Sequence, residues 1–195
     1  MTRLAKWRLL YSVFAGLLCS EAAHAADWGL EVLMDELAQR GSGQAYFSET
    51  KHLAVLDKPI EQTGTLAFAP GRLEKFTQQP HAERMTVVGD ALTVDMGPAS
   101  RKRQLRLHRY PALRGFIEGL RATLTGDLDV LRRFYEIELH GSADDWELVM
   151  VPNKPEMAAL VRLLSIRGGL GRITVIEVVQ NSGDRSVMQI TEHEP

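Results

Sequence analysis

The feature that most constrains this chain is a succession of short strand-like segments separated by turn signals. Between residues 45 and 109, apolar and polar residues alternate with a period of two, and Pro70-Gly71, Pro80-His81, Gly89-Asp90 and Gly97-Pro98 interrupt the alternation. These gaps are too short for the crossover helices that parallel strands require. The sequence therefore predicts an antiparallel meander. With the segments that follow, the expected strands are 45–55, 62–69, 73–78, 84–88, 92–96, 101–109, 135–140, 146–151, 172–180 and 185–191.

Helical periodicity appears in two places. Residues 27–39 place Leu30, Leu33, Met34 and Leu37 on one face, with Asp27 as the expected N-cap and Gly41 as the stop. A second helical region lies between the strands: Pro111 opens it, Gly126 interrupts it, and Asp127 is a suitable N-cap for its second part. Residues 156–166 fit either a helix or a strand.

About ten antiparallel strands in one domain curl or close rather than stay flat. The helices each have one apolar face that must be buried. We therefore expect a mainly β (α+β) fold, in which a curved antiparallel sheet forms an incomplete barrel and helices lie as a lid over its concave apolar face. A closed barrel with peripheral helices is the alternative.

The N-terminus is typical of a secretory signal peptide. Arg3, Lys6 and Arg8 precede a short apolar run, and Ala23-His24-Ala25 fits a cleavage site. The run of about ten residues is shorter than the roughly 20 that span a bilayer, although an uncleaved anchor is the alternative. We expect residues 1–25 to be the signal peptide, cleaved after Ala25, and residues 26–195 to be a single exported domain.

The chain has one cysteine, Cys19, which lies inside the predicted signal peptide. The mature protein would therefore have no thiol for a disulfide, a thiolate metal site or a nucleophile. Lipidation at Cys19 is disfavoured because the bulky Leu18 precedes it. The expected product is a soluble periplasmic protein.

Catalytic and metal-binding motifs are missing from the sequence. It contains no G-x-S-x-G, no phosphate-binding glycine loop, no H-E-x-x-H and no calcium-loop spacing. The glycine-rich residues 168–171 lead into a strand pattern, which favours a hairpin turn. We therefore expect no catalytic residue, no cofactor and no metal site.

Charge gives little indication of a nucleic-acid partner, because 23 basic and 25 acidic residues leave a formal net charge of −2. The strongest local charge is the run Arg101-Lys102-Arg103 with Arg106 and Arg109. A solvated outer strand face is the favoured interpretation, and a contact surface for an acidic partner or an anionic headgroup is the alternative.

Apolar side chains of the strands and helices are candidates for an internal cavity, although the same periodicity also fits a filled core. The candidate cavity residues are Phe47, Leu66, Phe68, Phe76, Met85, Val87, Leu92, Val94, Met96, Leu148, Met150 and Met188. The candidate lid residues are Leu113, Phe116, Ile117, Leu120, Leu124, Leu128 and Leu131. Glycines in the lid, such as Gly115 and Gly119, lower helix stability by about 1 kcal/mol each relative to alanine, which suits an element that opens.

Several segments carry a resemblance to the LolA-type periplasmic carriers, specifically to a divergent LolA-related branch. They are Phe47-Ser48-Glu49-Thr50-Lys51, Gly64-Thr65-Leu66-Ala67-Phe68, Pro70-Gly71-Arg72-Leu73, Val88-Gly89-Asp90-Ala91-Leu92, Gly126-Asp127-Leu128, Trp146-Glu147-Leu148-Val149-Met150-Val151-Pro152 and Gly183-Asp184-Arg185-Ser186. The order of helix, strands, helical insertion and strands also resembles the family over the whole mature chain.

The resemblance implies an incomplete barrel with a helical lid over a hydrophobic cavity that holds the acyl chains of a lipoprotein. It also implies an inner-membrane exporter and an outer-membrane acceptor as partners. In such carriers an arginine before the third-strand turn latches the lid; here Arg72 is the nearest candidate, and a solvated hairpin cap is its alternative role. Phe76 stands where the carriers have tryptophan, and Glu74 occupies a position expected to be apolar.

These observations predict a monomeric, non-enzymatic carrier that shields the acyl chains of a lipoprotein or lipid and transfers them toward the outer membrane. The alternatives are a carrier of a non-lipoprotein lipid such as a lipid-linked pigment, and a non-transport periplasmic accessory or assembly protein with the same fold. An exported hydrolase is disfavoured because no nucleophile and base are recognisable.

Overall fold

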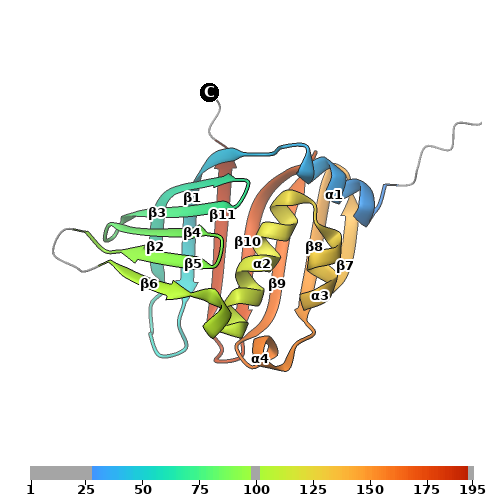
Figure 1. The fold of residues 1–195 in the computed structure, drawn as a ribbon. Helices are drawn as coiled ribbons and strands as arrows, with labels where there is room; N and C mark the ends of the chain where they lie inside the picture. Colours follow the sequence, from blue (N-terminus) through green and yellow to red (C-terminus); the bar gives the residue numbers. More distant parts are fainter. Residues whose placement is uncertain (1–27, 98–101, 193–195) are drawn as a thin grey trace, which may run out of the picture.

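The computed structural model describes residues 28–97 and 102–192, in which eleven strands form one open antiparallel sheet (Figure 1). The order across the sheet is β6-β5-β4-β3-β2-β1-β11-β10-β9-β8-β7. Two meanders, β1 to β6 and β7 to β11, are therefore joined by the pairing of β1 with β11. The strands are β1 (Gly43–His52), β2 (Ile60–Ala69), β3 (Arg72–Gln79), β4 (Glu83–Val88), β5 (Ala91–Asp95), β6 (Arg103–Arg106), β7 (Tyr135–Ser142), β8 (Asp145–Pro152), β9 (Val161–Gly169), β10 (Arg172–Gln180) and β11 (Arg185–Glu192).

Helices cover one face of this sheet. The helical elements are α1 (Leu30–Ala38), the 3₁₀ helix η1 (Leu107–Arg109), α2 (Pro111–Thr125), α3 (Leu128–Phe134) and α4 (Pro155–Ala158). The segment from η1 to α3 leaves the edge strand β6 and returns to the opposite edge strand β7. Figure 1 shows α2 and α3 in front of the strands β7 to β10, with the β1–β5 part of the sheet curving beside them.

The expected fold class is confirmed: the protein is mainly β, with a curved antiparallel sheet and helices over its concave face. The alternative of a closed barrel is wrong, because β6 and β7 are the two free edges of the sheet. The predicted signal peptide, including Cys19 and the cleavage site after Ala25, lies outside the described residues.

Capping agrees with the prediction at α3 and differs at α1, where Gly29 is the N-cap without a side-chain hydrogen bond and the expected N-cap Asp27 lies outside the described residues. The carboxylate of Asp127 accepts a hydrogen bond from the backbone N–H of Val130 at 2.9 Å, as expected of an N-cap. Gly126 ends α2 in the left-handed conformation with φ 67°. The ambiguous residues 156–166 divide into the end of the short helix α4 and the start of strand β9.

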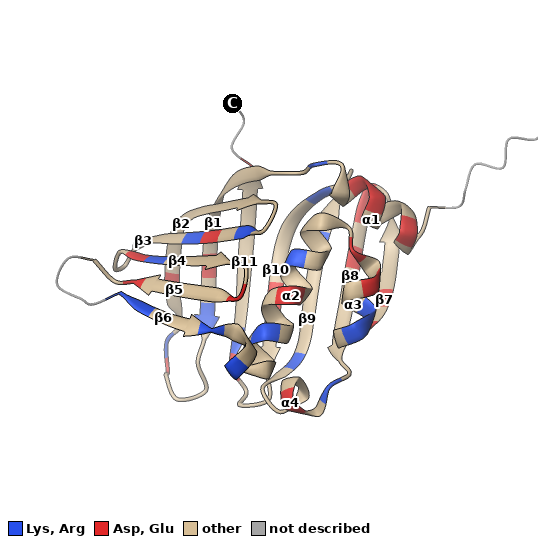
Figure 2. Ribbon diagram, viewed as in Figure 1, with Lys and Arg blue, Asp and Glu red and all other residues tan. Residues whose placement is uncertain are grey.

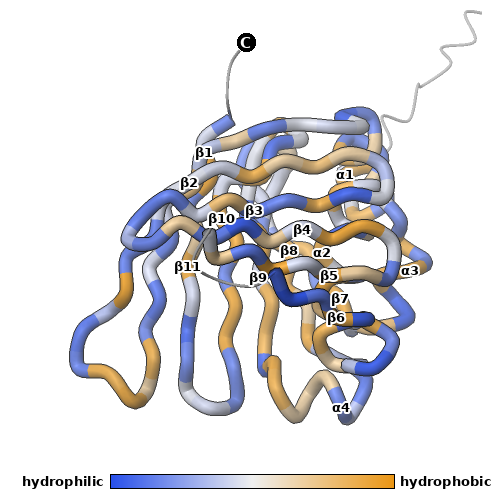
Figure 3. Tube along the Cα trace, turned by 60° about the vertical axis from the view of Figure 1, so that its left-hand side comes forward, coloured by the Kyte–Doolittle hydropathy of each residue, from blue (hydrophilic) through white to orange (hydrophobic). Residues whose placement is uncertain are grey.

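Two predicted strands end earlier in the structure: the strand at 45–55 ends at His52 in β1, and the strand at 101–109 ends at Arg106. The expected strand at 101–109 continues only through β6, after which η1 turns the chain so that Leu107 is fully buried. Figure 3 shows mostly hydrophilic residues along β6, and Figure 2 shows the basic residues at this edge of the sheet. Arg103 and Arg106 are exposed, as a solvated outer strand requires.

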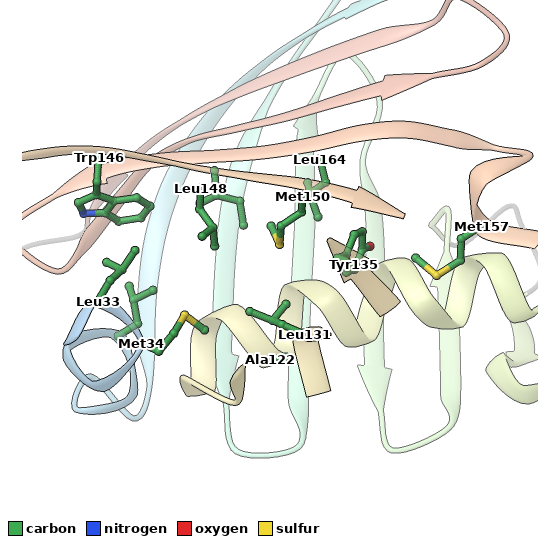
Figure 4. Packing of buried hydrophobic residues seen from close by; sticks show 12 residues of the cluster. Leu33, Met34, Ala122, Leu131, Tyr135, Trp146, Leu148, Met150, Met157 and Leu164 are labelled. Carbon is green, nitrogen blue, oxygen red and sulfur yellow. The ribbon is translucent and has the colours of Figure 1, made fainter. Parts of the chain in front are cut away.

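The main hydrophobic core lies between the helices and the β7–β9 part of the sheet (Figure 4). Trp146, Leu148 and Met150 of β8 point toward Leu33 and Met34 of α1 and toward Ala122 and Leu131 of the other helices. All of these side chains are at most 2% exposed. We call this group, completed by Leu37, Tyr135, Met157, Leu164 and Ile166, the dense core.

A second, smaller cluster lies near the other edge of the sheet, where Val87, Leu92, Leu107 and Ile117 pack together. The two clusters meet at α2, which contributes residues to both. Between them, the concave face of β1–β5 and β11 is incompletely filled, which positions the candidate site.

Candidate functional site

A cavity of about 640 Å³ lies between α2 and the concave face of the sheet. Successive strand residues point to opposite faces of a sheet, so alternate residues of each strand reach the cavity. In β11 these are Ser186, Met188 and Ile190, and in β3 they include Leu73 and Lys75. Its volume is within the usual range for small-molecule sites, roughly 300–1,000 Å³.

Helix α2 supplies the opposite wall of the cavity. Its residues at helical spacing that line the cavity are Leu113, Phe116, Ile117, Leu120 and Leu124. The two remaining candidate lid residues, Leu128 and Leu131, belong to α3 and pack on or within the dense core. The helical wall is therefore mainly α2, with Leu37 of α1 at its border, and α3 packs on the dense core.

Half of the candidate cavity residues lie at the cavity wall. These are Leu66, Phe68, Met85, Val87, Leu92 and Met188. Leu148 and Met150 lie instead in the dense core, each with no exposed surface. Phe47 is buried with its ring 4.8 Å from the Nζ of Lys75, and Val94 packs on the smaller cluster.

Two candidates lie away from the cavity. Phe76 alternates with Lys75 along β3 and so points to the outer face, where the exposed Arg84 covers its ring at 4.3 Å. Met96 is 53% exposed beyond the end of β5 and lines a separate, smaller pocket. The aromatic expected at position 76 is present in β3, but on the outer face of the sheet.

Arg72, the candidate for the lid latch, shares the outer face of β3 with Phe76. Its guanidinium donates to the carboxylate of Glu74 at 2.6 Å, and Arg84 also pairs with Glu74. The Arg72 side chain is about half exposed. This places Arg72 in a surface ion-pair cluster rather than against α2.

The cavity wall also contains charged residues. On the inner face of β1 and β3, the carboxylate of Glu49 accepts hydrogen bonds from the ammonium group of Lys75 and, at 2.5 Å, from the hydroxyl of Ser186. Lys51 lies 3.6 Å from the same carboxylate. A second ion pair, between Arg40 and Glu192, lines the cavity near the start of β1.

Burial and pairing act against each other in this cluster. Burial by itself raises the pKa of the Glu49 carboxyl, but the neighbouring ammonium and hydroxyl groups outweigh it and hold that pKa below its usual value. Burial lowers the pKa of the Lys75 ammonium, and its ion pair with Glu49 offsets this only in part.

Sequence reasoning did not select Glu49 and Lys75 as site residues, although a signal was present. Glu49 and Lys51 occur in phase with Ala45 and Phe47, on the apolar side of the strand alternation. Charged residues at positions that the period assigns to the interior are uncommon unless they are paired. That mismatch indicates where charged side chains interrupt the apolar wall.

Neither a metal-binding cluster nor a membrane-spanning helix occurs in the described part of the chain. Residues 28–97 and 102–192 contain no group of three histidine, cysteine or acidic side chains placed to hold a metal ion. Within the same ranges, the helices are too short or too polar to cross a bilayer.

Fold and cavity together define a class of protein, in which an open antiparallel sheet curves around an apolar cavity with a helix as its far wall. The sequence profile of the family described as "Outer membrane lipoprotein carrier protein LolA-like" matches residues 20–191. The chain therefore belongs to this LolA-like family, which confirms the resemblance inferred from its sequence. A search of curated proteins found no match.

Solved structures provide distant similarities. A LolA superfamily protein from Nitrosomonas europaea is 11% identical, with 86% of this chain and 96% of that chain covered and a TM-score of 0.46. A putative outer membrane lipoprotein-sorting protein domain from Vibrio parahaemolyticus is 10% identical, with coverages of 84% and 90% and a TM-score of 0.43. The lipoprotein LppX from Mycobacterium tuberculosis is 8% identical, with coverages of 85% and 96% and a TM-score of 0.42.

Proposed function

We propose that this protein binds the hydrocarbon chains of a lipoprotein or lipid in its cavity and carries them through the periplasm toward the outer membrane, with no catalytic step. The observation that supports this most directly is the apolar cavity of about 640 Å³ between α2 and the sheet. Membership of the LolA-like family supports the same role.

The energetics of such a carrier are set by two competing solvents. Removing a methylene group from water stabilises it by about 0.8 kcal/mol, so a 16-carbon chain gains roughly 12 kcal/mol in an apolar cavity. A bilayer offers nearly the same gain, and exchange with a membrane is therefore close to neutral. Met85 and Met188 in the cavity wall suit chains of varying shape because methionine is flexible and polarisable.

Transport in this direction requires a donor and an acceptor, because a carrier without an energy source moves cargo only toward higher affinity. We infer an inner-membrane exporter as the donor and an outer-membrane protein as the acceptor. The mature carrier, cleaved after Ala25, acts as a soluble monomer in this proposal. The intact mass of exported protein tests the cleavage; a mass that includes an acylated Cys19 contradicts the soluble form.

Native mass spectrometry of the protein purified from cells tests whether it carries lipid. We expect co-purified species that dissociate as lipid or acylated peptide. A protein that is lipid-free and also fails to take up added lipid would favour the non-transport accessory role with the same fold.

A tryptophan scan at two methionines localises the binding. Met188→Trp places a larger side chain in the cavity and fills part of it. Met96→Trp is the matched control at an exposed position outside this cavity. With the neutral apolar fluorophore N-phenyl-1-naphthylamine as probe, we expect Met188→Trp to weaken binding by about tenfold or more, the loss of roughly two methylene contacts. Equal effects of the two variants would place binding elsewhere.

A further inference from the structure

The ionic cluster on the concave wall lies within an otherwise apolar surface. The side chain of Glu49 is 6% exposed and that of Lys75 is 19% exposed. In register, Lys75 lies opposite Leu66 of β2 and Met85 of β4, both of which line the cavity. The charged groups therefore share one continuous wall with the side chains proposed to hold hydrocarbon.

Such a cluster is not needed to stabilise the sheet. Replacing a buried ion pair by apolar residues of similar volume is often neutral or stabilising, because two charges must be removed from water to form the pair. Apolar residues of the same face lie next to the cluster, with Met188 opposite Glu49 and Leu66 and Met85 opposite Lys75. A role beyond packing accounts better for charges at this place.

The hydrogen-bonding capacity of the cluster is incompletely used. An ammonium group has three donors, and within the described ranges the acceptor that Lys75 contacts is the carboxylate of Glu49. The other two donors of the Lys75 ammonium group are therefore available to oxygen acceptors from outside the chain.

The other partners of Glu49 leave Lys75 free to turn toward an anion. Glu49 keeps two other partners, Ser186 at 2.5 Å and Lys51 at 3.6 Å, when the ammonium group of Lys75 turns toward a ligand. Glu83 also acts on Lys75 electrostatically, and its negative charge opposes a ligand anion, so the hydrogen bond from Lys75 must supply the preference. A ligand anion in the cavity thus meets Lys75, while Ser186 and Lys51 keep the Glu49 carboxylate paired.

We propose that Lys75, supported by Lys51 and Glu49, binds the anionic head of a single-chain amphiphile whose hydrocarbon lies along the cavity wall. The head is a carboxylate or a phosphate monoester, which share the charged oxygen acceptors that an ammonium group binds. This inference rests on the proposed function and narrows its cargo. The acyl chains of a lipoprotein end in methyl groups, which gain nothing from a charged cluster in the wall.

Displacement of N-phenyl-1-naphthylamine tests this with four ligands that share a 16-carbon chain: palmitate, hexadecyl phosphate, hexadecanol and hexadecyltrimethylammonium, each below its micelle concentration or, for hexadecanol, below its solubility limit. We expect one or both anions to displace the probe about tenfold better than hexadecanol, as one charge-assisted hydrogen bond allows. Preference for palmitate over hexadecyl phosphate, or the reverse, identifies the head. Equal affinity for anion and alcohol, or tightest binding of the cation, overturns the proposal.

Variants then locate the head. Lys75→Arg keeps the charge and should keep the preference, whereas the double variant Glu49→Leu with Lys75→Met should lose it and still bind hexadecanol, which shows that the cavity is intact. Arg84→Met, on the outer face, is the matched control and should bind as the wild type does. If Arg40→Met removes the preference and the double variant does not, the head lies at the other end of the cavity and the proposal fails.

The two proposals fail in distinguishable ways. If the wild-type protein binds neither the fluorophore nor any of the four ligands, the carrier function itself is wrong. If it binds all of them without regard to the head, the carrier function stands and the assignment of Lys75 is wrong.

Discussion

The β7–β9 side of the molecule and the β1–β5 side use the same kinds of residues and differ in how completely these fill the space under the helices. On the first side, large side chains such as Trp146 and Tyr135 reach the helices, and every side chain of the dense core is at most 2% exposed. On the second, Leu66, Met85 and Met188 stop short of α2 and leave a cavity. One side acts as a scaffold, and the other remains available for a ligand.

Helix α2 shows the difference on its own two faces. Gly115 and Gly119 face the dense core, where an added Cβ at Gly119 would lie 2.6 Å from the ring of Tyr135 and one at Gly115 would meet Met157. The Tyr135 hydroxyl donates to the carbonyl oxygen of Gly115 at 3.4 Å, and its burial raises the pKa of the phenol. Leu113 and Leu120, on the other face, line the cavity. The glycines thus admit close packing on one side of the helix.

The largest expected effect compares the same truncation on the two sides. Leu148→Ala, in the dense core, should lower the free energy of unfolding by about 2–5 kcal/mol, because it leaves a cavity in a packed region. Leu66 already borders a cavity, so Leu66→Ala should lower the free energy of unfolding by about 1 kcal/mol or less. Urea denaturation measures both, and equal losses would contradict the division into filled and hollow sides.

A smaller effect is expected at the packed face of α2. Gly119→Ala gains about 1 kcal/mol of helix propensity but should overpack against Tyr135 by about 1–3 kcal/mol, for a net destabilisation. Arg114→Ala, at an exposed position of the same helix, is the control and should change stability little. A stabilised Gly119→Ala protein would show that α2 is loosely held on this side, as expected of a lid that opens freely.

Hydrogen exchange distinguishes the faces without a mutation. Before lipid is added, we expect the amides of α2 to be less protected than those of β8. With palmitate or another bound lipid at ten times its dissociation constant, exchange in α2 should slow by about tenfold where it proceeds through the ligand-free state. Protection that is uniform and unaffected by lipid would indicate a permanently packed helix.

The smallest expected effect is the pH dependence of the cavity cluster. Because the folded protein holds the pKa of Glu49 below its usual value near 4.5, ionisation of this carboxyl stabilises the fold above that pH and is lost as the pH falls through the lower folded pKa. Wild type should therefore lose more stability than Glu49→Gln during acidification from about pH 5. Glu136→Gln, which removes an exposed carboxylate, should follow the wild-type curve. Thermal melts from neutral pH to pH 3 measure the difference.

Much of the fold could be predicted because it depends on local signals. The period-two alternation, the turn residues and the cap at Asp127 all lie within a few positions of the structures that they specify, and most appear where expected, although β1 ends at His52 and not at Val55. The end of the strand at Arg106 was not predictable in this way. Burial of Leu107 against Val87 and Leu92 is a tertiary contact that overrides the continuing alternation.

The site was less predictable because its residues are defined by how far side chains reach across the molecule. Leu148 and Leu66 have the same local pattern, yet the first is in the dense core and the second lines the cavity. Phe76 illustrates the register problem, since a shift of one residue along a strand moves a side chain to the other face. Arg72 follows the same alternation and lies on the outer face beside Glu74.

The connection of both ends of the helical segment to opposite edges of an open sheet has a mechanical consequence. The sheet is curved, and the chain from η1 through α3 connects its two edge strands, β6 and β7. The 15 residues of α2 form a rigid helix of about 22 Å within that connecting segment. Flattening the sheet moves β6 and β7 apart and stretches the segment between them, whereas stronger curvature brings the two edges closer and relaxes it. The curvature of the sheet and the position of α2 therefore change together. A ligand that pushes α2 away from the sheet strains the sheet as a whole.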